Sequence, residues 1–244
     1  MEPSRTIIAR FVIVLTTLIG GGTLLLFGIF LFRGSYRLVD FGLSPAGALA
    51  LDASLCLAFC VQHSAMVRKS VRRRVERIVP SDYYGALYTV SSAVPLLALL
   101  GLWQNPTFVI AGLVGPGRWL AHVIFVVALL GLLWSERSIA QFDPFGVRPI
   151  RARLRRREVK PSPFAVRGAY RWVRHPQYFF TLVLFWARPD LTADRLVLNG
   201  IFTVWVVFGT ILEERDLVVE FGHDYVEYQR RVPMLVPWRG PLAS

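Results

Sequence analysis

Long apolar runs limit what this chain can fold into more than any other feature of the sequence. Apolar runs of about 18 or more residues are typical of membrane-spanning helices. Five runs approach or exceed that length: Phe11–Phe32, Ala46–Val67, Leu87–Trp103, Trp119–Trp134 and Leu196–Leu212. A sixth, Tyr178–Ala187, is too short to cross a bilayer alone, although a helix starting at Pro176 would lengthen it. We therefore predict an all-α integral membrane protein with about six transmembrane helices: five long ones and the short arm of a helical hairpin.

The first run, Phe11–Phe32, has the position of a secretory signal peptide. It is longer than the apolar core of a signal peptide. The residues after it, Arg33-Gly34-Ser35-Tyr36-Arg37, contain no small-residue cleavage site. We therefore expect this run to be the first membrane helix.

Basic residues predict the orientation of the helices. The chain has 28 Arg and Lys against 16 Asp and Glu, which gives a net charge of +12. So basic a chain raises the question of nucleic-acid binding. The charges flank the apolar runs, however, as they do in cytoplasmic loops, so we expect a lipid bilayer and no nucleic acid as partner. With the amino terminus inside, most of the Arg and Lys fall in inside segments, namely 1–10, 68–86, 135–177 and 213–244. The positive-inside rule therefore predicts that both termini are cytoplasmic.

Two polar clusters flank the last apolar hairpin, 176–212. Arg174-His175-Pro176-Gln177-Tyr178 precedes it, and Glu213-Glu214-Arg215-Asp216-Leu217 follows it. If the hairpin enters the bilayer and returns, the two clusters meet at one membrane face. Cationic, imidazole and phenol groups then lie beside two carboxylates, and we predict a binding site there.

Each member of these clusters also has a simpler structural explanation. Arg174 would serve equally as an anchor at the membrane surface or as a partner for Glu213, and His175 as a helix cap. Tyr170 and Tyr178 suit the aromatic belt of a membrane interface. His63, at the end of the second run, suits a hydrogen bond at a helix terminus.

Several common kinds of site are absent from the sequence. It contains no P-loop, no GxGxxG after a strand, no HExxH and no GxSxG. Cys56 and Cys60 lie in an apolar run, four residues apart on one helix face, where we expect packing rather than a disulfide. His63, His175 and Cys60 do not have a diagnostic metal-ligand spacing, so we expect no metal.

The polar clusters belong to a longer pattern that resembles the isoprenylcysteine carboxyl methyltransferase superfamily of integral membrane methyltransferases. The matching segments are Gly168–Tyr178, Glu213–Leu217, Phe221–Tyr228 and Val232-Pro233. Further segments look like the bacterial methanethiol S-methyltransferase branch and the related NnrU-like proteins, namely Val61–Arg68, Phe142–Gly146, Phe185-Trp186 and Val232–Leu235.

The resemblance implies that S-adenosylmethionine is the cofactor and that the carboxy-terminal loops enclose it. The residues expected to bind it are Ser162, Pro163, Phe164, Ala165, Tyr170, Arg174, His175, Pro176, Gln177, Tyr178 and Glu213. Candidate catalytic residues are His63, His175 and Glu213, with either histidine as a base for a thiol acceptor. The resemblance to a bacterial branch also implies the bacterial inner membrane.

This reading divides the chain into two parts. Residues 1–134 would form a four-helix transmembrane part. Residues 135–244 would form the catalytic part, in which a cytoplasmic loop, the hairpin 176–212 and a C-terminal cytoplasmic helix with its tail form the cofactor pocket. The loop contains Phe142-Asp143-Pro144-Phe145-Gly146, which is either only a turn or part of the site.

The acceptor is less closely defined than the cofactor. Eukaryotic members of the superfamily have a substrate-binding arginine four residues before the first glutamate of the pair, and this sequence has Gly209 there. An arginine suits a carboxylate acceptor, so its absence favours a small neutral thiol such as methanethiol, unless the glycine only makes room. A prenyl or lipid-like acceptor and a non-catalytic NnrU-like accessory protein are the alternatives. The sequence leaves the oligomeric state open.

Overall fold

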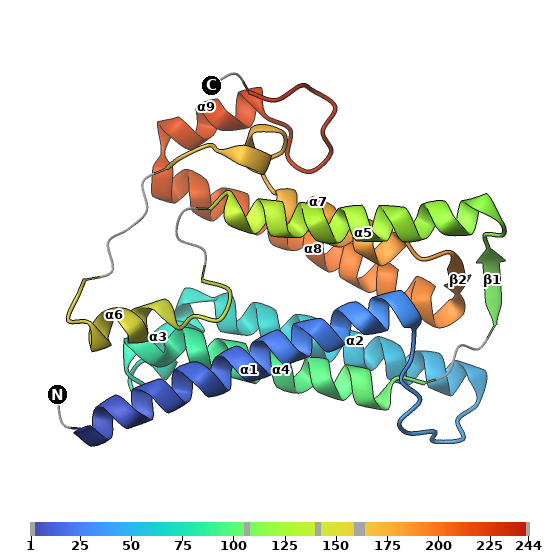
Figure 1. Cartoon of the computed structure of the whole chain (residues 1–244), viewed down its shortest axis with the longest axis horizontal. Coiled ribbons are helices and arrows are strands. Elements are labelled where there is room, and N and C mark those ends of the chain that lie inside the picture. The colour runs from blue at the N-terminus through green and yellow to red at the C-terminus, as the bar shows by residue number, and fades with distance from the viewer. Residues whose placement is uncertain (1–2, 105–107, 140–142, 159–163, 243–244) are drawn as a thin grey trace. The chain divides into compact units, whose positions relative to one another are not determined.

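The computed structural model describes residues 3–104, 108–139, 143–158 and 164–242. Figure 1 shows the helices and strands of these residues in order. The elements are α1 (Pro3–Arg33), α2 (Pro45–Val67), α3 (Lys69–Val75), η1 (Ser81–Tyr83), α4 (Tyr84–Leu102), β1 (Val109–Gly112), α5 (Pro116–Arg137), α6 (Arg148–Leu154), η2 (Gly168–Arg171), α7 (Pro176–Trp186), β2 (Asp190–Thr192), α8 (Ala193–Phe221) and α9 (His223–Arg231).

Five helical segments within the described residues are long and apolar enough to cross a membrane. They are Ser4–Arg33, Pro45–Val67, Ser81–Leu102, Pro116–Arg137 and Ala193–Phe221. This confirms the all-helical membrane architecture. A sixth spanning helix is not confirmed, because α7 has only 11 residues. At about 1.5 Å per residue α7 is about 16 Å long, roughly half of the 30 Å hydrocarbon core.

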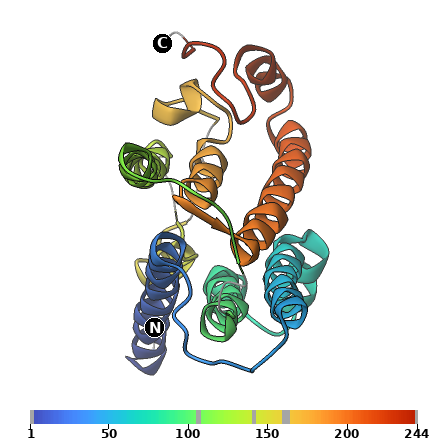
Figure 2. The same ribbon diagram turned by 90° about the vertical axis from the view of Figure 1, so that its right-hand side faces the viewer.

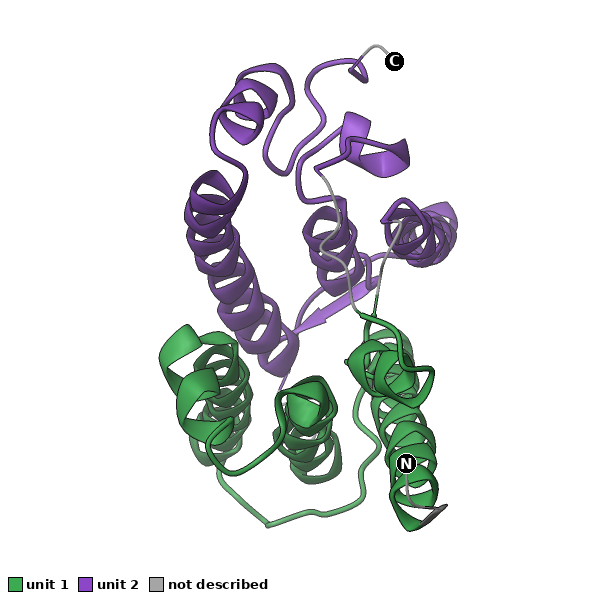
Figure 3. Ribbon diagram, turned by 90° about the vertical axis from the view of Figure 1, so that its left-hand side faces the viewer, with its two compact units in different colours: residues 1–107, 143–161 green, residues 108–142, 162–244 purple. Residues whose placement is uncertain are grey.

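The chain folds into two compact units (Figure 3). Unit 1 contains Met1–Thr107 and Asp143–Pro161, and unit 2 contains Phe108–Phe142 and Ser162–Ser244. The division of the chain at residue 135 into a transmembrane part and a catalytic part stays a prediction.

In unit 1, α4 packs between α1 and α2 (Figure 2). The loop before α6 is fixed on this layer, because Phe145 fits against Gly20 of α1 and Gly146 lies directly against Gly85 of α4. Gly146 has a φ of +62°, which favours glycine. The Asp143 carboxylate accepts hydrogen bonds from the first N–H groups of α6. The described part of this loop is therefore a structural turn, and Phe142 lies outside the described residues.

In unit 2, α7 packs between α5 and α8. Gly131 of α5 lets the Phe180 ring of α7 approach, because a Cβ at position 131 would overlap that ring. At one end, β1 and β2 form an antiparallel ribbon in which Val109 pairs with Thr192. Arg118 forms an ion pair with Asp190 beside the ribbon. The segment 187–192, which includes β2, joins the short α7 to the start of α8, and the ribbon and the ion pair hold it in place.

The last membrane helix, α8, is long enough to extend beyond the bilayer. Its 29 residues measure about 43 Å at 1.5 Å per residue, against a hydrocarbon core of about 30 Å. Its last turns carry the second polar cluster. Gly222, with a φ of +59°, ends the helix and allows α9 to turn away.

Candidate active site

The carboxy-terminal tail holds the first polar cluster in position. The N–H of Arg174 donates to the carbonyl of Pro233 at 2.8 Å, and the N–H of His175 donates to the carbonyl of Met234 at 3.1 Å. Pro176 follows as the first residue of α7, where a missing N–H costs no helical hydrogen bond. These two backbone hydrogen bonds and the proline together fix the direction in which the Arg174 and His175 side chains leave the backbone.

Glu214 of α8 forms the centre of a buried polar network. Its carboxylate accepts hydrogen bonds from Arg174 Nε and Nη2 at 2.8 and 2.7 Å, from His175 Nε2 at 2.8 Å, from Tyr225 Oη at 2.7 Å and from Gln229 Nε2 at 2.7 Å. The Arg174 pair is bidentate, which is the strongest geometry for this kind of contact. The two polar clusters therefore meet, as the hairpin in the sequence predicts.

Arg174 makes four hydrogen bonds through its guanidinium group. Besides its two bonds to Glu214, its Nη1 donates to the carbonyls of Gln229 and Val232 at 3.0 and 2.5 Å. Its side chain is only 10% exposed. These contacts agree with the structural explanation of Arg174 as a pairing partner for a glutamate, and its role in binding a ligand stays a prediction. The partner is Glu214 rather than Glu213.

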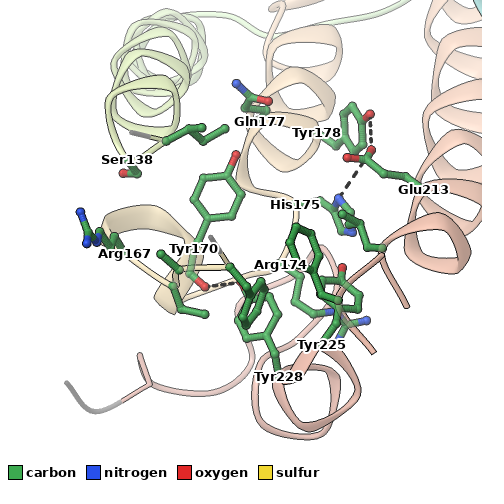
Figure 4. A pocket seen from close by; sticks show the side chains of 16 residues that line it. Ser138, Arg167, Tyr170, Arg174, His175, Gln177, Tyr178, Glu213, Tyr225 and Tyr228 are labelled. Atoms are coloured by element: carbon green, nitrogen blue, oxygen red, sulfur yellow. Dashed lines mark hydrogen bonds and ion pairs between the residues drawn. The ribbon is translucent and has the colours of Figure 1, made fainter. Parts of the chain in front are cut away.

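Glu213 has the opposite environment, as Figure 4 shows. Tyr178 Oη donates to its Oε2 at 2.6 Å, and His175 Nδ1 lies 3.9 Å from the same oxygen. The rings of His175 and Tyr178 stack with their centroids 5.6 Å apart. Successive helical residues point about 100° apart. One glutamate of the pair therefore lies in the buried network and the other faces an open cavity.

That cavity has a volume of about 320 Å³ and lies within unit 2. Eight of the predicted site residues line it: Phe164, Ala165, Tyr170, Arg174, His175, Gln177, Tyr178 and Glu213. In Figure 4, Tyr170 lies on one side of the cavity, and His175, Tyr178 and Glu213 gather on the other. Most of the candidate residues predicted from the sequence therefore lie at one concave site.

Aromatic rings form one wall of the cavity. Phe164 lies with its ring centroid 5.3 Å from that of Phe221, 5.9 Å from that of Tyr225 and 5.5 Å from that of Tyr228. Tyr228 Oη donates to the carbonyl of Tyr170 at 2.5 Å, which ties α9 to η2. The rings meet in tilted and edge-to-face arrangements, and their faces and edges give this wall an aromatic surface.

Burial keeps the tyrosines of the site neutral. It raises the pKa of Tyr170, and the nearby charge of Glu213 raises it further. It also raises the pKa of Tyr225, where the hydrogen bond to Glu214 acts in the same direction. These phenols are therefore hydrogen-bond donors at physiological pH rather than bases.

Four predicted site residues are not placed at the cavity. Pro176 does not line it and instead begins α7. Ser162 and Pro163 lie outside the described residues. His63 belongs to unit 1, where its Nε2 lies 2.6 Å from Tyr88 Oη. That contact agrees with its structural explanation as a hydrogen-bonded residue near a helix end.

The cavity also includes residues that were not predicted to bind a ligand. They are Ser138, Ile139, Val166, Arg167, Leu217, Phe221, Tyr225 and Tyr228. The last four recur at helical spacing in the sequence, on either side of a break at Gly222, and this spacing is the signal that could have found them. Ser138 has no such signal. Its Oγ accepts from the N–H of Ala169 at 3.2 Å across 31 residues of sequence, and so positions η2.

Comparisons with known proteins point to one family. The family model described as NnrU protein matches residues 53–236. A methanethiol S-methyltransferase of Pseudomonas sp. strain GM41 is 36% identical, covering 79% of this chain and 74% of its own length. A methanethiol S-methyltransferase of Mycobacterium tuberculosis is 34% identical, covering 83% of this chain and 84% of its own.

A more distant relative is Nurim of Rattus norvegicus, which is 27% identical and covers 71% of this chain and 70% of its own length. No solved structure matches the chain significantly. The family match covers most of the chain, including both polar clusters and the tail that holds them. The chain therefore belongs to the NnrU family, within the isoprenylcysteine carboxyl methyltransferase-like group of membrane proteins that includes these relatives.

Proposed function

We propose that this protein is a membrane-embedded, S-adenosylmethionine-dependent methyltransferase that S-methylates a small thiol such as methanethiol. The observation that carries the proposal is the cavity of about 320 Å³ at the meeting point of the two polar clusters. Relatives at 31–36% identity are named as methanethiol S-methyltransferases, and that name implies a methyl donor and a thiol acceptor for those proteins.

The residues of the cavity fit the chemical groups of S-adenosylmethionine. The aromatic wall formed by Phe164, Phe221 and Tyr225 suits its adenine. The Glu213 carboxylate suits its cationic or hydroxyl-bearing groups. Arg167 is exposed and lines the cavity, where a guanidinium suits its carboxylate. Each group of the donor therefore has a partner of matching chemistry.

The surroundings of Gly209 support a neutral acceptor. A Cβ at this position would meet no atom within 4 Å among the described residues. Close packing is therefore not the reason for the missing side chain. This turn of α8 therefore offers no arginine to a carboxylate acceptor, and the candidate cation at the cavity, Arg167, is assigned to the carboxylate of the donor. This favours a small thiol over a prenylcysteine carboxylate.

Methyl transfer from a sulfonium needs positioning and exclusion of water more than strong acid–base catalysis. The donor supplies an activated methyl group when bound. On the protein side, the Glu214 network and the tail hold His175 at the cavity. Tyr178 stacks on His175 and donates a hydrogen bond to Glu213. The aromatic wall gives one side of the cavity an apolar surface. An apolar thiol can reach such a site through the bilayer, which explains why the site lies at the end of membrane helices.

The decisive experiment is calorimetric binding of S-adenosylhomocysteine to the purified protein in detergent. We expect wild type to bind, Glu213→Ala to weaken binding at least about tenfold, or 1.4 kcal/mol, and Glu220→Ala, an exposed glutamate of the same helix, to bind like wild type. No binding by folded wild type would overturn the proposal and leave the accessory-protein alternative. Methylation of a prenylated acceptor but not of methanethiol would select the lipid-like alternative.

A further inference from the structure

Glu214 is not a member of the cavity wall, yet it controls a residue that is. Its two oxygens accept five hydrogen bonds, three on Oε1 and two on Oε2. The side chain is 11% exposed. A carboxylate that receives a bidentate guanidinium is in its ionised form, which only accepts hydrogen bonds. Every group that contacts it must therefore present a hydrogen.

This requirement decides the tautomer of His175. Its Nε2 lies 2.8 Å from Glu214 Oε1, so Nε2 carries a hydrogen and donates. In neutral imidazole the other nitrogen then has a free lone pair. The hydrogen bond of one ring nitrogen thus fixes the role of the other.

The second nitrogen, Nδ1, is on the side of the ring that faces Glu213. It lies 3.9 Å from Glu213 Oε2, which is beyond hydrogen-bond distance but close enough for Coulombic attraction. The Glu213 oxygen already accepts from Tyr178, whose ring stacks on the imidazole. His175 itself lines the cavity. A proton taken up at Nδ1 would therefore lie between two carboxylates, one at each ring nitrogen.

Among the described groups around the imidazole, Arg174 carries a like charge, and this charge is paired with the Glu214 carboxylate. The Arg174 guanidinium is directed at Glu214 and at two backbone carbonyls. Tyr225 and Tyr178 both donate to the glutamates. The carboxylates of Glu213 and Glu214 carry two negative charges and Arg174 carries one positive charge. A positive charge on His175 would therefore bring these four side chains to a net charge of zero.

We propose that Glu214 is a positioning residue that holds His175 as the Nε2–H tautomer, so that Nδ1 takes the proton of the thiol acceptor. This rests on the proposed function. The thiol S–H bond breaks and its proton moves to Nδ1. The thiol sulfur forms the new bond to the methyl carbon, and the old bond of that carbon breaks with its electron pair left on the donor sulfur. Glu213 and Glu214 then flank the imidazolium.

The first test determines the tautomer of His175 without measuring enzyme activity. The protein, labelled with ¹⁵N in its histidine rings, is reconstituted in detergent, and its imidazole nitrogens are observed by NMR. The chain has four histidines, and the His175 signal is the one lost in His175→Gln. We expect the pattern of an Nε2–H imidazole in wild type and a mixture of tautomers in Glu214→Gln. The control Glu220→Gln should look like wild type. An Nδ1–H ring in wild type would overturn the proposal.

The second test separates a base from a structural histidine by changing the acceptor. His175→Gln places an amide N–H where Nε2 donates, and so keeps the bond to Glu214 while removing the base. General base catalysis contributes about 10²–10⁴-fold. We expect His175→Gln to slow methylation of methanethiol by about 100-fold or more. Methaneselenol has almost the same shape but is ionised at neutral pH, so its methylation should slow by less than about fivefold relative to wild type.

The outcomes also distinguish this inference from the proposed function. Equal slowing with both acceptors would mean that His175 only supports the structure, and the inference would be wrong while the methyltransferase stands. Failure of wild type to bind S-adenosylhomocysteine would overturn both the inference about His175 and the proposed methyltransferase function. If Glu214→Gln does not fold, two results still test the inference: the tautomer of His175 in wild type, and the slowing of His175→Gln with methanethiol compared with methaneselenol.

Discussion

Two adjacent glutamates illustrate how single residues acquire different roles. Glu213 has a side chain that is 44% exposed and faces the cavity, whereas the Glu214 side chain is 11% exposed and lies among five donors. The difference follows from the rotation of about 100° between neighbouring helical residues. A buried carboxylate is tolerated only when it is paired and hydrogen-bonded, and Arg174 supplies the paired charge.

At this scale we expect Arg174→Met to be strongly destabilising. It leaves the Glu214 carboxylate buried beside two remaining phenol or amide donors and a histidine, and removing one member of a buried pair costs about 3–5 kcal/mol. Thermal unfolding in detergent should show the loss as a clearly lowered Tm. Arg230→Met, on α9 with a side chain 73% exposed, is the control and should cost less than about 1 kcal/mol. Equal Tm values for the two variants would contradict the network.

Among the helices, the contact between α5 and α7 depends on one small residue. Gly131 is buried in α5, and the Phe180 ring of α7 occupies the space that a side chain there would fill. This contact positions the start of α7, and with it His175 and Tyr178, relative to Ser138 at the end of α5. An element too short to cross the membrane is therefore fixed by packing against a long neighbour.

We predict that Gly131→Leu lowers stability by about 1–3 kcal/mol, because it overpacks this contact. Unfolding in detergent measures the change. The control is Gly117→Leu in the same helix, where a Cβ would meet only ordinary contacts of 3.7 and 3.8 Å. Adding Phe180→Ala to Gly131→Leu should recover part of the loss. No recovery would show that the damage lies elsewhere.

On the scale of the whole molecule, the protein is an integral membrane protein with five helices long enough to span among its described residues. Large apolar side chains stay exposed on these helices, for example Leu18 at 68% and Leu130 at 60%. Such exposure suits contact with lipid rather than water. The segment 187–192 follows α7, and its pairing with β1 gives partners to backbone groups that would find none in lipid.

The distribution of Arg and Lys predicts that both termini lie in the cytoplasm, and reporter fusions test it. Green fluorescent protein fused after Ser244 should fluoresce in a bacterial host, and alkaline phosphatase at the same position should be inactive. Fusions at Arg188, between α7 and α8, should give the reverse result. Active phosphatase at both positions would contradict the predicted topology.

The sequence by itself determined the membrane helices, the hairpin and the meeting of the two polar clusters. It did so because a backbone in lipid must satisfy its own hydrogen bonds, so the length and apolarity of a run already specify a helix. The resemblance to a known family then supplied half of the residues that line the cavity.

Only the tertiary structure decided which glutamate is buried, which groups Arg174 contacts and how Ser138 and Arg167 join the site. These outcomes depend on contacts between residues far apart in the chain, such as the 40 positions that separate Arg174 from Glu214. Sequence periodicity describes the faces of one helix, but it does not say which neighbour each face meets. Packing between helices makes that choice, and in doing so it gives His175 its orientation at the cavity.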